Sequence, residues 1–83
     1  MLVQATPNPN ALKVTVNRVV APRSVTYRDA AGAEAPWARE LLGITGITQV
    51  FALNNFLSIT KASGIEWETI VPQVEAIVKR AFA

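Results

Sequence analysis

The sequence predicts an α+β fold: a two-layer sandwich in which a four-stranded antiparallel sheet carries two helices on one face. Three observations predict it. Residues 12–16 and 25–27 alternate apolar and polar side chains with the period of a strand. Asn54 and Asn55 separate two apolar runs, as in a hairpin. Two further segments, beginning at Pro36 and near Trp67, repeat apolar residues at helical spacing. The predicted element order is therefore ββαββα.

The N-terminal third is expected to form a turn and two strands. Residues 6–10 read TPNPN, and this alternation of proline and asparagine blocks helix and central strand and favours an extended turn. Leu12, Val14 and Val16 then give the first strand one apolar face. Residues 21–23 (APR) interrupt the pattern before a shorter second strand at 25–27, and residues 29–34 form a small-residue loop.

Both helices have recognisable ends. Pro36 suits a first helical position, because its missing N–H has no partner there, and Gly43 provides a stop after about two turns. Ser63 and Glu66 have the S-x-x-E spacing of a capping box and predict the start of the second helix. From Trp67 onward, apolar residues recur at the helical period.

The hairpin predicted over residues 47–61 divides its side chains between two faces. A two-residue turn at Asn54-Asn55 pairs Leu53 with Phe56 and Val50 with Ile59. One face then carries Val50, Ala52, Leu57 and Ile59, and the other carries Phe51, Leu53 and Phe56. If the helices cover the first set, the second faces solvent together with Lys13, Thr15, Thr26 and Arg28.

An exposed apolar cluster with basic residues around it is typical of a protein-binding surface. Phe51, Leu53, Phe56, Lys13 and Arg28 are therefore candidate partner-binding residues. Asn8 and Asn10 join them, because polar loops often carry function. Two alternatives stay open: the helices cover the other sheet face, or the 6–10 segment covers one of the phenylalanines. The 6–10 segment can also be interpreted as a rigid turn without a binding role, in which the asparagine side chains hydrogen-bond to their own backbone.

The chain contains neither cysteine nor histidine. Disulfides, thiolate nucleophiles and zinc or iron–sulfur sites built on these side chains are thereby excluded, and so is the commonest general base. We therefore expect no enzyme and assign no catalytic residue, cofactor or metal ligand. Eight basic and six acidic residues give a net charge of +2. With no long apolar run and no signal-peptide pattern at its start, the 83-residue chain is expected to be one cytoplasmic domain.

Five stretches carry a resemblance: TPNPNALK at 6–13, APWARELL at 35–42, GITQVF at 46–51, NFLSITK at 55–61, and Trp67 with Pro72. In this order they resemble the N-terminal domain of the Nfu/NifU-like iron–sulfur cluster scaffold family, with the first stretch the most specific. Full-length members bind a 4Fe–4S cluster through a C-x-x-C pair in a second domain. The resemblance therefore assigns no cluster ligand to this cysteine-free chain.

The resemblance implies a stand-alone accessory domain that supports cluster assembly or delivery by docking an iron–sulfur scaffold or acceptor protein. The alternative is a single-stranded nucleic-acid-binding module, because aromatic residues on an open sheet face with basic neighbours can stack bases. The modest charge and the order of elements make nucleic acid the weaker interpretation.

Overall fold

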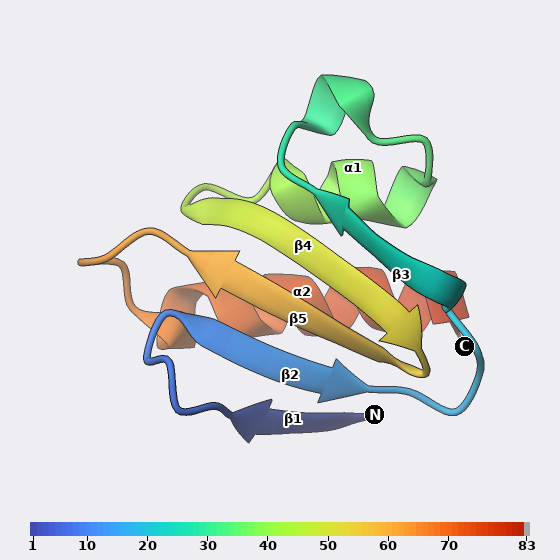
Figure 1. Cartoon of the computed structure of the whole chain (residues 1–83). Coiled ribbons are helices and arrows are strands. Elements are labelled where there is room, and N and C mark those ends of the chain that lie inside the picture. The colour runs from blue at the N-terminus through green and yellow to red at the C-terminus, as the bar shows by residue number, and fades with distance from the viewer. Residues whose placement is uncertain (83) are drawn as a thin grey trace.

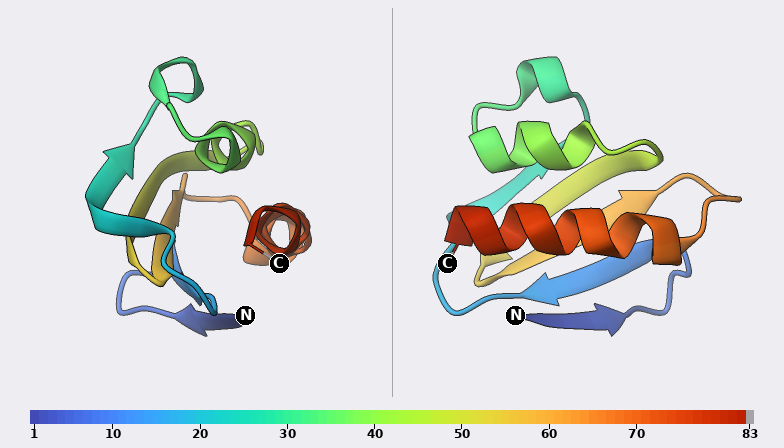
Figure 2. Two further views of the ribbon diagram at one scale, coloured as in Figure 1. Left: turned by 90° about the vertical axis from the view of Figure 1, so that its right-hand side faces the viewer. Right: turned by 180° about the vertical axis from the view of Figure 1, so that it is seen from behind.

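The computed structural model describes residues 1–82 and contains one sheet, two α-helices and one 3₁₀ turn. The strands are β1 (Leu2–Ala5), β2 (Ala11–Thr15), β3 (Ala21–Tyr27), β4 (Ile47–Asn54) and β5 (Phe56–Lys61). The helices are α1 (Pro36–Leu42) and α2 (Trp67–Phe82), and the 3₁₀ turn is η1 (Ala30–Gly32). Both α-helices lie on the same side of the sheet (Figures 1 and 2). Among residues 1–82, no helix is long and apolar enough to cross a membrane.

The sheet has the order β1-β2-β5-β4-β3, and every neighbouring pair is antiparallel. The α+β class and the two helices on one face are confirmed, but the prediction of four strands is wrong. The additional strand, β1, pairs along its whole length with β2, so the element order is βββαββα. It has only four residues, of which Val3 alone is partly buried, and such a short segment carries no readable alternation.

The β4–β5 hairpin has the register that the sequence predicts. Leu53 pairs with Phe56 and Val50 with Ile59 across the two strands. Asn54 takes the positive φ, 51°, that the tight turn requires. The chain between β2 and β3 holds this turn in place: Val16 N–H donates to the Asn55 carbonyl (2.8 Å) and Val20 N–H to that of Asn54 (2.6 Å).

The core lies between the hairpin and the helices. The inward residues of the hairpin, Val50, Ala52, Leu57 and Ile59, are fully buried. They belong to one cluster with Leu41 of α1 and with Ile70, Val74 and Val78 of α2. The expectation that the helices cover this face is therefore confirmed, and the reversed assignment is wrong.

Strand β3 begins earlier than predicted. Pro22 lies inside it rather than interrupting it, and the strand spans seven residues. A proline is tolerated here because β3 is an edge strand and one side of its backbone needs no partner. The pairing with β4 is irregular between Ala21 and Val25, which explains why the alternation reads clearly only from Val25.

Helix α2 begins at Trp67, so the predicted capping box does not form. With Ser63 as N-cap, Gly64 would be the first helical residue, but its φ is +85°. The helix then continues through Pro72 to Phe82. Pro72 is exposed and has no N–H to donate to the carbonyl of Glu68 one turn earlier. Glu68 lies in the exposed first turn, where water can donate to that carbonyl instead.

The glycines provide a test of the connections around β4. Gly46 and Gly64 have φ values of 100° and 85°, but only at Gly46 would a Cβ atom clash, at 2.6 Å from the Ile65 Cδ1 atom. We expect Gly46→Ala and Gly64→Ala each to lose about 1–2 kcal/mol of unfolding free energy from backbone strain. Gly46→Ala should lose more, because the Ile65 side chain must also move: its Cδ1 end can turn away, but its Cγ2 atom would lie 3.2 Å from the new Cβ atom. Urea denaturation measures both, with Gly32→Ala, which meets nothing within 4 Å, as control. Equal losses at Gly46 and Gly64 would contradict the packing described.

Candidate binding face

The sheet surface that points away from the helices is called the open face below, and Figure 1 looks onto it. Strand pairing places side chains of neighbouring strands in rows across this face. Lys13 on β2 is opposite Ser58 on β5, which is opposite Phe51 on β4, and Phe51 is opposite Thr26 on β3. A second row runs from Thr15 through Phe56 to Leu53. The predicted apolar cluster and Lys13 are thus brought together.

The centre of the open face is an aromatic pair. Phe51 and Phe56 are diagonal neighbours on β4 and β5, with ring centroids 6.0 Å apart and planes inclined by 42°. The Lys13 Nζ atom lies 4.8 Å from the Phe56 ring centroid, within the range of a cation–π contact. Phe51, Leu53 and Phe56 are each partly buried, because their side chains lie against the sheet and one another. They form an apolar strip that remains accessible along its outer surface.

A second basic residue lies on the other side of this strip. Arg28 follows β3, and its Nε–H donates to Oε1 of Gln49 on β4 (2.9 Å). Lys13 and Arg28 are therefore separated by three strand spacings, roughly 14 Å. None of the five strands contains an aspartate or a glutamate, so all six carboxylates lie on helices and connections. The strands of the open face accordingly carry no negative charge, although Asp29 directly follows Arg28 and lines the same hollow.

The loop of residues 6–10 uses its polar groups internally. The Thr6 hydroxyl accepts the Asn8 N–H (3.2 Å) and donates to the Ala11 carbonyl (2.9 Å). The Asn8 Oδ1 atom accepts the Asn10 N–H (2.9 Å). These bonds are the turn chemistry that favours asparagine and threonine at such positions. Asn8 thus holds the loop in shape and lies away from the open face.

Asn10 connects the loop to a buried lysine. Its Oδ1 atom accepts a hydrogen bond from Lys61 Nζ (3.1 Å), and the Pro9 carbonyl accepts one from Trp67 Nε1 (2.9 Å). Lys61 is only 8% exposed, and its Nζ atom lies 5.5 Å from the centre of the Trp67 ring. The sequence interpretation missed this role, although Lys61 shares the inward parity of Leu57 and Ile59 on β5.

The loop therefore does not cover the aromatic pair. It precedes Ala11, which pairs with Thr60, whereas Phe56 pairs with Thr15 at the opposite end of β2. Five of the seven candidate residues share the open face, and Asn8 and Asn10 lie at one end of the sheet beside Trp67. Within residues 1–82, no three acidic side chains come together in a way that could hold a metal ion.

The contact between Asn10 and Lys61 predicts an energetic coupling. Asn10→Ala removes an acceptor from a buried ammonium group and should lower the unfolding free energy by about 1–3 kcal/mol. Lys61 Nζ then keeps only the more distant Ala62 carbonyl (3.4 Å) as acceptor. Adding Lys61→Met removes the ammonium group, so the double variant should be destabilised by less than the sum of the single changes. Urea denaturation of the cycle measures this. Asn17→Ala, at an exposed asparagine, is the control and should cost little. If the effects of the two single substitutions simply add, the hydrogen bond between Asn10 and Lys61 contributes nothing to the free energy of unfolding.

The comparisons with known proteins agree with this fold. "Conserved virulence factor C" of Staphylococcus aureus (strain USA300) is 35% identical over 75 residues, which are 89% of this chain and 20% of that protein. "NFU1 iron-sulfur cluster scaffold homolog, mitochondrial" of Drosophila persimilis is 35% identical over 83 residues, 96% of this chain and 29% of that protein. The chain thus spans less than a third of these curated relatives.

Solved structures match over nearly the whole chain. The crystal structure of protein SAV1430 from Staphylococcus aureus has a TM-score of 0.83 and 28% identity, and covers 93% of this chain and 94% of its own. A solution structure from Staphylococcus epidermidis has a TM-score of 0.69 and 26% identity, with 98% and 95% covered. The family described as "Scaffold protein Nfu/NifU N terminal" matches residues 1–83. The chain therefore belongs to the Nfu/NifU N-terminal family.

Proposed function

We propose that this chain is a non-catalytic docking domain that supports iron–sulfur cluster assembly or delivery, and that it binds a partner protein through the open face. The observation that carries the proposal is the aromatic pair Phe51–Phe56, which lies on the sheet surface that no helix covers. A protein-binding surface typically has an apolar, aromatic centre and a polar rim. The open face has such a centre, and Lys13 and Arg28 lie on its two sides.

The partner is a cysteine-bearing scaffold or acceptor protein. Residues 1–83 contain no cysteine and no histidine, so the ordinary ligands of a cluster lie outside this domain. Family membership and the similarity to an iron–sulfur scaffold homolog support a role in that process. Because the open face carries only positive charge on its strands, acidic residues around the contact site of the partner would favour association.

A titration with a C-x-x-C-bearing scaffold domain from the same organism tests the proposal. Amide shifts of the labelled chain should concentrate on β2, β4 and β5 around Lys13, Phe51 and Phe56. Phe51→Thr combined with Phe56→Thr should weaken binding by about thirtyfold or more, as expected for an aromatic hot spot, while the fold persists because threonine suits a strand. Val19→Thr, at an apolar residue 64% exposed and outside the strands, is the matched control.

Several outcomes would count against the proposal. Full binding by the double variant would place the contact elsewhere, and a spectrum unchanged at high partner concentration would remove this partner. Loss of the folded spectrum on double substitution would show that the two rings serve stability. Circular dichroism of each variant separates this last case from a loss of binding.

Single-stranded nucleic acid is the second candidate, favoured by the stacking surface of Phe51 and Phe56 beside Lys13. An oligonucleotide titration at two salt concentrations separates the two functions. Binding that weakens steeply with salt and is lost in the double threonine variant would favour nucleic acid. The absence of binding at low salt would exclude it.

A further inference from the structure

The two edges of the sheet differ in how they are protected. Edge strand β3 contains Pro22 and Arg23, and its pairing with β4 is irregular between Ala21 and Val25. Prolines, charges, irregularities and a short length are the usual devices that stop an edge from pairing with another strand, and of these β1 has only the last, with four residues. Edge strand β1 has the sequence LVQA, with no charge, no proline and an unbroken register against β2. The outer side of β1 is therefore open to a further strand.

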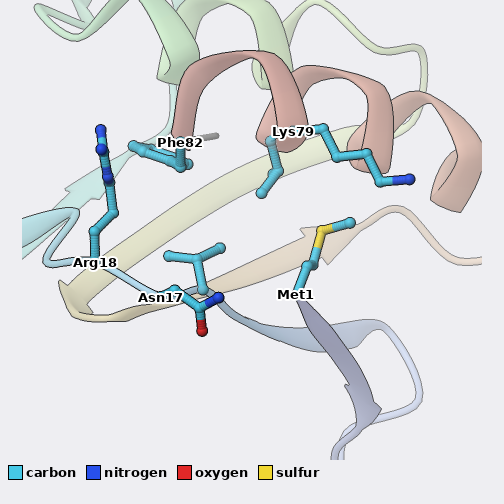
Figure 3. A pocket seen from close by; sticks show the side chains of 7 residues that line it. Met1, Asn17, Arg18, Lys79 and Phe82 are labelled. Atoms are coloured by element: carbon cyan, nitrogen blue, oxygen red, sulfur yellow. The ribbon is translucent and has the colours of Figure 1, made fainter.

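A pocket lies at the start of this edge, between β1 and the last turn of α2 (Figure 3). Its volume is about 520 Å³, within the range of small-ligand sites. Buried Val16 and Val78 and half-buried Phe82 give it an apolar lining, and exposed Met1 lines it next to β1, so a peptide that enters from this edge must displace the Met1 side chain. Such a pocket can take an apolar side chain.

The rim of the pocket is basic. Arg18 and Lys79 stand on opposite sides of it, and Asn17 adds a polar group (Figure 3). Both basic residues are exposed, and the side chains that line the pocket include no carboxylate. The rim therefore complements an anion held next to the apolar pocket.

We propose that β1 accepts an extended peptide as a sixth, antiparallel strand, whose apolar C-terminal residue enters the pocket and whose free carboxylate lies at the basic rim to which Arg18 and Lys79 belong. The direction follows from the fold. A strand antiparallel to β1 has its C-terminal end beside Met1, where the pocket is, whereas a parallel strand would place an ammonium group near two cations. Backbone pairing supplies affinity and the pocket supplies specificity, as in other cases of strand addition. Leu2 and Gln4 of β1 lie opposite Thr15 and Lys13 and so continue the open face, but the outer edge of β1 is two strands away from Phe56 on β5.

The probe is a six-residue peptide that alternates threonine and valine and ends in leucine, labelled with fluorescein at its N-terminus. Fluorescence anisotropy should detect its binding, and amide shifts of the protein should concentrate on Leu2–Ala5, Arg18 and Lys79. Amidation of the peptide C-terminus, Arg18→Glu or Lys79→Glu should each weaken binding by about tenfold or more, because each removes or repels the carboxylate. Methylation of alternate backbone nitrogens of the peptide should abolish it. The control Arg23→Glu, on the other edge, should bind normally.

Three results would overturn this inference: equal binding of the acid and the amide peptide, shifts on β3 or the open face instead of β1, and a concentration-dependent dimer through β1 that binds no peptide. Sedimentation analysis measures the last. Phe51→Thr combined with Phe56→Thr should leave peptide binding unchanged. The two surfaces can therefore fail or succeed separately.

Discussion

The register of the β4–β5 hairpin is the constraint on which the rest of the molecule depends. The turn at Asn54 fixes which residues of the two strands face each other, and a shift of one residue would exchange the two faces. A shift of β5 would take Ile59 out of the core and put Phe56 into it, and a shift of β4 would do the same to Val50 and Phe51. Two amide groups of the β2–β3 connection, from Val16 and Val20, hold the turn carbonyls and so secure the register from outside the hairpin.

The same register separates stability from recognition. The inward face is entirely occupied by contacts with α1 and α2, which leave no hairpin side chain free on that side. The outward face has no structural partner, and its aromatic pair packs only as a tilted stack with Lys13 alongside. Because every acidic side chain lies on a helix or a connection, the strands of this surface carry no negative charge. Substitutions can therefore change this surface at little cost to the core.

Period-two alternation made the hairpin and its two faces predictable, because Asn54-Asn55 marks the turn and apolar residues flank it. Strand β1 was not predictable, because four residues without charge or alternation resemble any short segment. The capping-box spacing at Ser63 and Glu66 predicted the wrong start for the second helix. Gly64 has a positive φ that a helix does not allow, and residue spacing does not reveal a backbone angle. Five of the seven candidate residues share one surface, as the alternation of the strands predicts. Asn10 instead contacts Lys61, which is 51 residues away in the sequence, and local sequence patterns do not predict such a contact.

The order of strands has a consequence for how the protein is made. Strands β2 and β3 follow each other in the chain but lie on opposite sides of the hairpin, each paired with one of its strands. During synthesis from the N-terminus, the first 46 residues can pair only β1 with β2, because β4 and β5 have not yet left the ribosome. An isolated two-stranded pair is marginally stable. The nascent chain must therefore wait for the hairpin before any core exists, and this domain then folds as one late event after β4 and β5 have emerged.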